Sequence, residues 1–151
     1  MSGYFEFRSP EDLARKAQRD LDAFDKHASA NDLWNAVVTT NHVWDWVKHD
    51  STLEVSVRAS RPSRATNDDV KLLMDLANGL KHFKREGTPP TKRHHYGSAR
   101  LGNAVPGEAK LGSPPATKYL VTQPDGSEVE VRHVVRDVLD AWHDFLAEAR
   151  A

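Results

Sequence analysis

The chain has 151 residues, with 21 Lys and Arg, 22 Asp and Glu, no cysteine and a formal net charge of −1. This length suits one globular domain of residues 1–151. Without cysteine there is no disulfide framework, thiolate zinc site, iron–sulfur cluster or cysteine nucleophile. The first residues lack a secretory signal, and no apolar run reaches the roughly 18 residues of a membrane span, so we expect a soluble, cytoplasmic protein without a membrane partner.

The first half of the chain predicts three helices. A serine cap, a proline and two acidic residues predict a helix over 10–27. Apolar residues at helical spacing predict a second helix over 33–49. Residues 52–57 alternate with period two, which predicts a short edge strand or an extended connector. A third helix, over 67–83, has apolar residues on more than half of its circumference, which is typical of a central helix.

The second half predicts a loop, a hairpin and a last helix. Residues 84–117 hold five of the eight Gly, five of the eight Pro and six basic residues against two acidic ones, which predicts a long basic loop. Two short strands, 119–122 and 129–131, flank a Pro-Asp-Gly turn and predict a hairpin. A helix is predicted over 132–149. The sequence therefore predicts a mainly α fold, a four-helix bundle with one small β-hairpin before the last helix.

The second predicted helix carries a polar face opposite its apolar stripe. This face collects Asn35, Thr39, His42, Asp45, Trp46 and His49. Polar groups mixed with an indole suggest that another helix or a second subunit covers the face, and we therefore expect a homodimer. His42, Asp45 and His49, at positions i, i+3 and i+7, could coordinate a metal ion. Histidines oriented by Asp45 and Asn41 are the simpler interpretation, so no metal is expected.

The third predicted helix carries a narrow polar sector on an otherwise apolar surface. The sector contains Asp75, Asn78 and His82, with Lys71 and Lys81 beside it. Buried without partners, each such group would cost about 1–3 kcal/mol, so the sector needs a matching polar surface, a ligand or water. The natural match is the polar face of the second helix. We therefore expect a polar layer that contains His42 and His82, either as a structural network or as a functional pocket.

A basic cluster lies inside the predicted loop. It consists of Lys92, Arg93, His94, His95 and Tyr96. Such a cluster could stack on bases and contact the phosphates of a single strand, or it could be a solvated basic loop. The chain has no Walker loop, no Gly-x-Gly-x-x-Gly after a strand and no Gly-x-Ser-x-Gly elbow, and we expect no cofactor.

Several segments resemble a recurrent group of uncharacterised bacterial and phage proteins. They are residues 7–13, 35–42, 75–83 and 125–127, with Val138 and Trp142. The most specific parts are His-x-x-Asp-Trp, at His42, Asp45 and Trp46, and Asn-x-x-Lys-His, at Asn78, Lys81 and His82. The resemblance covers nearly the whole chain, but the group has no settled activity to carry over.

The Asn-x-x-Lys-His helix also resembles, more distantly, the HEPN superfamily of helical-bundle proteins, many of which are dimeric ribonucleases. In those enzymes an Arg, a following polar residue and a later His act together on RNA. Asn78 and His82 match the polar residue and the His, whereas Ala77 stands at the Arg position. The resemblance implies a HEPN-like bundle that pairs as a dimer.

These features predict three functions. The first is a non-enzymatic binding or interaction module for nucleic acid or a nucleotide, because Ala77 cannot supply the charge-stabilising contact to a phosphate. The second is a metal-independent endoribonuclease, in which His82 is the general acid or base, Asn78 orients it or the substrate, and Lys81 or a loop arginine balances the phosphate charge. The third is a purely structural dimer whose polar layer is satisfied internally.

Overall fold

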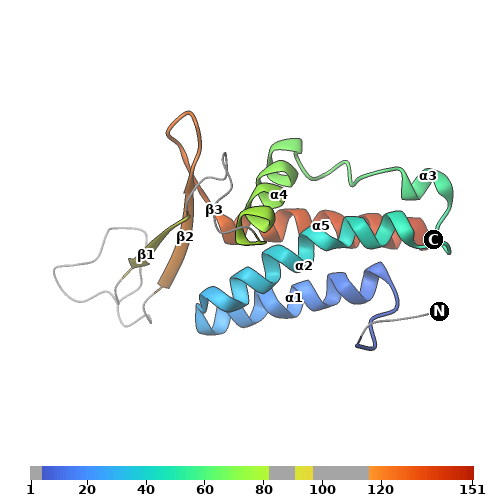
Figure 1. Cartoon of the computed structure of the whole chain (residues 1–151), viewed down its shortest axis with the longest axis horizontal. Coiled ribbons are helices and arrows are strands. Elements are labelled where there is room, and N and C mark those ends of the chain that lie inside the picture. Colours follow the sequence, from blue (N-terminus) through green and yellow to red (C-terminus); the bar gives the residue numbers. More distant parts are fainter. Residues whose placement is uncertain (1–4, 82–90, 97–115) are drawn as a thin grey trace.

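The computed structural model describes residues 5–81, 91–96 and 116–151, and the fold is mainly helical (Figure 1). In chain order its elements are α1 (Pro10–His27), α2 (Ala30–His49), α3 (Val55–Arg58), α4 (Asn67–Lys81), β1 (Thr91–Tyr96), β2 (Ala116–Thr122), β3 (Glu128–Glu130) and α5 (Val131–Arg150). The mainly α fold and the small hairpin before the last helix are confirmed, whereas the HEPN-like arrangement stays a prediction. None of the described helices is both long and apolar enough to cross a membrane.

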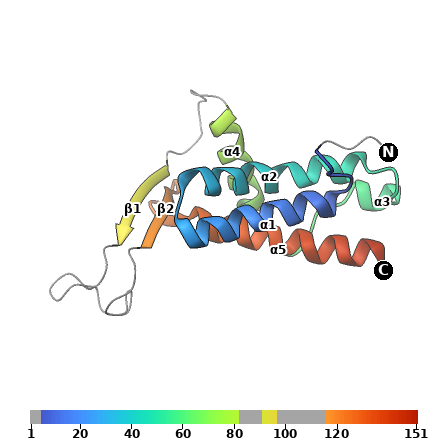
Figure 2. The same cartoon turned by 90° about the horizontal axis from the view of Figure 1, so that it is seen from below.

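Three long helices, α1, α2 and α5, lie side by side (Figures 1 and 2). The shorter α4 contacts α2 and α5 and crosses them near the sheet (Figure 1). The core forms where the apolar stripes of these helices meet, as their helical spacing predicts. Its fully buried members include Leu21, Val37, Val43, Leu73, Val121, Val135 and Leu139. Thr40 is also fully buried, and its hydroxyl has no hydrogen-bond partner in the described structure.

The start of α1 forms the capping box that its sequence predicts. The backbone N–H of Asp12 donates to Ser9 Oγ at 3.2 Å, and the backbone N–H of Ser9 donates to the Asp12 carboxylate at 3.1 Å. A further backbone N–H, from Arg8, lies 2.8 Å from this carboxylate. The bond from the Arg8 backbone, followed by the side chains of Arg15 and Ser9, holds the pKa of Asp12 below its ordinary value. The predicted bounds of 10–27 agree with α1.

The strand or connector predicted at 52–57 is wrong, because the structure forms the short helix α3 there. A half-buried strand would place Leu53, Val55 and Val57 on one covered face. Instead Leu53 is buried, whereas Val55 is 72 % exposed. Asp50 turns the chain out of α2 by accepting hydrogen bonds from the backbone N–H and hydroxyl of Thr52, at 2.9 and 2.7 Å. The local turn therefore overrides the alternating pattern.

The prediction of an unbroken loop over 84–117 is also wrong, because β1 lies inside this segment. The described sheet has three antiparallel strands in the order β1-β2-β3. The sequence Thr-Lys-Arg-His-His-Tyr has no apolar alternation, so pairing with β2 rather than an intrinsic pattern accounts for the strand. In the register of this pair, Arg93 lies opposite Tyr119 and His94 opposite Lys118.

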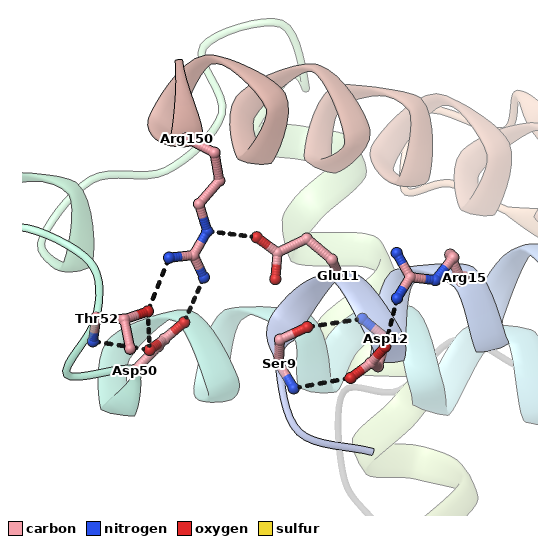
Figure 3. A network of polar contacts seen from close by, with 7 residues as sticks. All are labelled: Ser9, Glu11, Asp12, Arg15, Asp50, Thr52 and Arg150. Atoms are coloured by element: carbon pink, nitrogen blue, oxygen red, sulfur yellow. Dashed lines mark hydrogen bonds and ion pairs between the residues drawn. The ribbon is translucent and has the colours of Figure 1, made fainter. Parts of the chain in front are cut away.

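Arg150 joins the end of α5 to the start of α1 and to the turn that follows α2, at the end of the molecule away from the sheet (Figure 3). Its guanidinium donates to Glu11 at 2.8 Å, to Asp50 at 2.8 Å and to Thr52 at 2.7 Å. We call these four residues the Arg150 clamp. Burial raises the pKa values of Glu11 and Asp50, but the hydrogen bonds of Arg150, Thr52 and their neighbours outweigh it and hold both pKa values below their ordinary range. The same bonds raise the pKa of Arg150.

Candidate functional site

The candidate site is a cavity of about 340 Å³ between α2 and α4. We call it the polar cleft. Its described lining consists of Trp34, Val38, Asn41, His42 and Asp45 from α2, and Ala77 and Asn78 from α4. Counted from Trp34, the other α2 residues stand four, seven, eight and eleven positions further along, so one face of the helix presents them all. Its volume lies within the range of about 300–1,000 Å³ that is typical of small-molecule sites.

The polar side chains of the cleft do not bond to one another across the two helices. Asp45 instead pairs with Lys48 on its own helix, at 2.7 Å between Oδ1 and Nζ. Asn41, His42 and Asn78 have no side-chain hydrogen bond within the described residues. The structure therefore brings the predicted polar surfaces of α2 and α4 together around an open space, with hydrogen-bonding groups left available to a ligand or to water.

Trp34 forms the edge of the cleft, and its side chain is 47 % exposed. An indole this exposed offers a flat apolar surface next to the amide groups of Asn41 and Asn78. Sequence reasoning missed this role. The signal was available, because Trp34 precedes Val38, Asn41 and Asp45 at intervals that keep all four on one helical face.

Other predicted members of the α2 face lie elsewhere. Asn35 is exposed outside the cleft. Thr39 is buried against α1, where it accepts a hydrogen bond from Lys16 Nζ at 3.1 Å and lies 3.4 Å from Asp20. Trp46 is partly buried against the core of its own chain. This cover agrees with the alternative in which the helices of the same chain cover the face, and cover by a second subunit stays a prediction.

Asp75 lines a different hollow, of about 770 Å³, between α4 and the turn that joins β2 to β3. Its carboxylate pairs with Lys71 of the same helix at 3.0 Å. The predicted polar sector of the third helix is thus divided, because Asn78 faces the polar cleft whereas Asp75 and Lys71 face the hairpin.

Several predicted site residues are placed only in part or not at all. His82 lies outside the described residues, so the predicted proximity of His42 and His82 stays a prediction. Lys81 is the last residue of α4. Arg93, His94 and His95 are placed on β1 by their backbone.

No group of three His, Asp or Glu side chains within residues 5–81, 91–96 and 116–151 is arranged to hold a metal ion. His49, the third member of the set with His42 and Asp45, is bound to its own helix, since its Nδ1 lies 2.7 Å from the backbone oxygen of Asp45. The described chemistry of the cleft is therefore that of amides, an imidazole, a carboxylate and an indole.

A second, smaller cavity adjoins the polar cleft. We call it the apolar slot, and its volume is about 160 Å³. Its walls are Leu33, Trp34, Val37, Leu76, Tyr119 and Val131, and the exposed Ala30 and Asn31 complete the described lining. Trp34 belongs to both cavities, so the slot and the cleft share one wall.

Many cations of the described chain are already paired with carboxylates. They include Arg15, Lys16, Lys48, Arg64, Lys71, Arg132, Arg136 and Arg150. Such pairs lower the attraction that the helical body can exert on a polyanion.

Comparison of the chain with protein-family models, with curated proteins and with solved structures finds no match.

Proposed function

We propose that this protein is a non-enzymatic binding module that holds an unpaired base of single-stranded RNA, or the base of a nucleotide, in the polar cleft. The observation that carries this proposal is the set of free hydrogen-bonding groups on Asn41, His42 and Asn78 beside the half-exposed indole of Trp34. An RNA ligand agrees with the cytoplasmic location expected from the sequence.

A nucleobase matches both parts of this lining. Its flat face can stack on an aromatic side chain, which is worth about 1–3 kcal/mol per base, and its edge carries the donors and acceptors that amides recognise. Asparagine in particular can bond in a bidentate manner to adenine. Recognition of a splayed, unpaired base by aromatic and amide groups is also the usual mode of sequence-specific RNA binding.

The basic strand β1 supports a nucleic acid rather than a free base. Arg93 pairs in register with Tyr119, and Tyr119 lines the apolar slot that shares Trp34 with the cleft. An RNA strand that leaves the cleft past Trp34 would thus approach the segment that contains Lys92, Arg93, His94 and His95. We propose that this segment contacts phosphates.

Binding is favoured over catalysis because Ala77 lines the cleft directly beside Asn78. A methyl group at this place leaves the cleft wall without the guanidinium that would stabilise developing phosphate charge. The rival proposal is an endoribonuclease that uses His82, with Asn78 and Lys81. It is tested by incubating the protein with single-stranded RNA in the presence of a chelator. If the wild-type protein cleaves the RNA and His82→Ala does not, the endoribonuclease proposal is favoured over binding alone.

The test of the binding proposal is fluorescence anisotropy with a labelled single-stranded RNA of eight nucleotides. Asn78→Ala should weaken binding about tenfold through the loss of one base contact. The matched control is Asn35→Ala, which removes the same amide from an exposed position of α2 outside the cleft and should leave the affinity unchanged. Arg93→Ala should lower the salt dependence of binding. Equal effects of Asn78→Ala and Asn35→Ala would contradict the proposal.

We also propose a homodimer as a second candidate, because two exposed apolar side chains flank the cleft. Trp34 is 47 % and Met74 is 41 % exposed, and Met74 lies one turn from Ala77 and Asn78 on α4. Light scattering at micromolar concentration should then report twice the 16.9 kDa mass of the chain. Met74→Lys should return the protein to a monomer, and a monomeric wild type would exclude this candidate.

A further inference from the structure

The apolar slot is set apart from the polar cleft by its chemistry. Its walls are aliphatic and aromatic, and Asn31 is the amide in its described lining. The slot offers little hydrogen-bond recognition, so a group bound there would be selected by shape and by stacking.

The size of the slot limits what it can hold. Its volume of about 160 Å³ is close to that of an apolar cavity of about 150 Å³ that is known to accept benzene. A single six-membered ring fits this volume, whereas the fused rings of a purine are larger. Two aromatic side chains, Trp34 and Tyr119, are available to contact such a ring.

The walls of the slot are held in place by the surrounding structure. Tyr119 contacts Phe24 of α1, with 6.0 Å between the ring centroids, and Leu33, Leu76 and Val131 are buried in the core. These contacts fix the walls other than Trp34 before any ligand arrives, which lowers the entropic cost of binding.

We propose that the apolar slot receives the ring of a second, pyrimidine base, next to the base held in the polar cleft. This inference rests on the proposed function and gives it a footprint of two adjacent nucleotides. In this arrangement the shared Trp34 lies between the two bases, and the RNA strand continues past Tyr119 towards β1. The cleft base is identified by hydrogen bonds, whereas the slot base is selected by ring size.

The experiment compares a nucleoside with dinucleotides by isothermal titration calorimetry. Adenosine occupies only the cleft. ApU adds a pyrimidine on the 3′ side of the adenine, and UpA adds one on its 5′ side. The better of the two dinucleotides should bind the wild-type protein about tenfold more tightly than adenosine, because it adds one stacked base. ApA should gain less than threefold, because the size of the slot matches a single six-membered ring more closely than the fused rings of a purine.

A variant that fills the slot isolates its contribution. Ala30 is exposed at the slot, so Ala30→Phe places a ring there without removing a core side chain. It should abolish the gain of ApU or UpA and leave the affinity for adenosine unchanged. Asn31→Phe provides a second variant with the same expectation. The matched control is Ala147→Phe, at an exposed position of α5, which should behave like the wild type.

The possible outcomes separate the two proposals. If adenosine binds and loses affinity in Asn78→Ala, but neither dinucleotide binds more tightly, the slot inference is wrong and the proposed function stands. A dinucleotide gain that survives both slot variants also overturns the inference. If neither adenosine nor any dinucleotide binds the wild-type protein, the proposed function itself fails.

Discussion

The Arg150 clamp and the polar cleft contain similar numbers of polar groups, but they use them differently. In the clamp one guanidinium reaches three partners on two chain segments, Glu11 in α1 and Asp50 with Thr52 in the turn after α2 (Figure 3). In the cleft the groups of Asn41, His42 and Asn78 face a cavity and have no hydrogen bond within the described residues.

This difference separates polar groups that stabilise the fold from those available for binding. Paired groups add stability because their removal leaves a partner without its bond. Groups that face an open cavity add little to stability and keep their donors and acceptors for a ligand. Measurements of stability can therefore test the assignment of each region without knowledge of the ligand.

The largest effect is expected for Arg150→Ala, which should lower the free energy of unfolding by about 2 kcal/mol. It leaves the carboxylates of Glu11 and Asp50 without their cation, at side-chain exposures of 24 % and 10 %. Urea denaturation measures the change. Arg136→Ala is the control, because Arg136 pairs with an exposed neighbour, Asp137, and its loss should cost less than about 0.5 kcal/mol.

The clamp should also make the free energy of unfolding depend on pH. The loss of stability at low pH should be no larger than the loss caused by Arg150→Ala. The folded-state pKa values of Glu11 and Asp50 lie below their ordinary values of 4.5 and 3.8, so the unfolded chain binds protons more readily. Stability should therefore be complete above about pH 5 and fall as the pH is lowered towards 3. In Arg150→Ala this decline should be smaller. If the variant and the wild type show the same pH profile, the clamp does not cause the loss of stability at low pH.

Thr40→Val should raise the free energy of unfolding by about 1 kcal/mol. The Thr40 hydroxyl is fully buried without a partner, and valine has nearly the same shape without the cost of burying an unpaired polar group. The neighbouring Thr39→Val is the contrast, because Thr39 is bound to Lys16 and its replacement should be destabilising. Thermal or urea unfolding distinguishes the two, and destabilisation by Thr40→Val would reveal an overlooked partner.

The smallest effect is expected in the cleft. Asn78→Ala and His42→Ala should each change the free energy of unfolding by less than about 0.5 kcal/mol, since neither side chain has a described partner to lose. Urea denaturation of both variants provides the measurement. A loss of more than about 1 kcal/mol would support the structural polar layer instead of a binding site.

The helices were predictable because the local signals and the tertiary packing agree. The cap of α1 and the apolar stripes of α1, α4 and α5 appear in the structure as the sequence indicates. The errors occurred where long-range pairing or a local turn prevailed. β1 has no periodic signal and forms through pairing with β2. At α3 the turn that Asp50 makes with Thr52 overrides a period-two pattern.

The candidate site was predictable in part. Helical spacing placed His42, Asp45 and Asn78 on faces that the structure brings to one cavity. It could not show that Thr39 turns to α1, or that Asp75 turns to the hairpin, because both depend on how α1 and the sheet pack around these helices. The apolar slot was missed for the same reason, since its lining comes from four separate elements.

The direct junction of β3 and α5 has a mechanical consequence. β3 ends at Glu130 and α5 begins at Val131, so no loop separates the hairpin from a helix of 20 residues. Val131 is also a wall of the apolar slot. A force that widens the slot at this wall must therefore tilt a helix packed along the length of the bundle (Figure 2). The packing of α5 in the body of the molecule therefore sets the orientation of the hairpin.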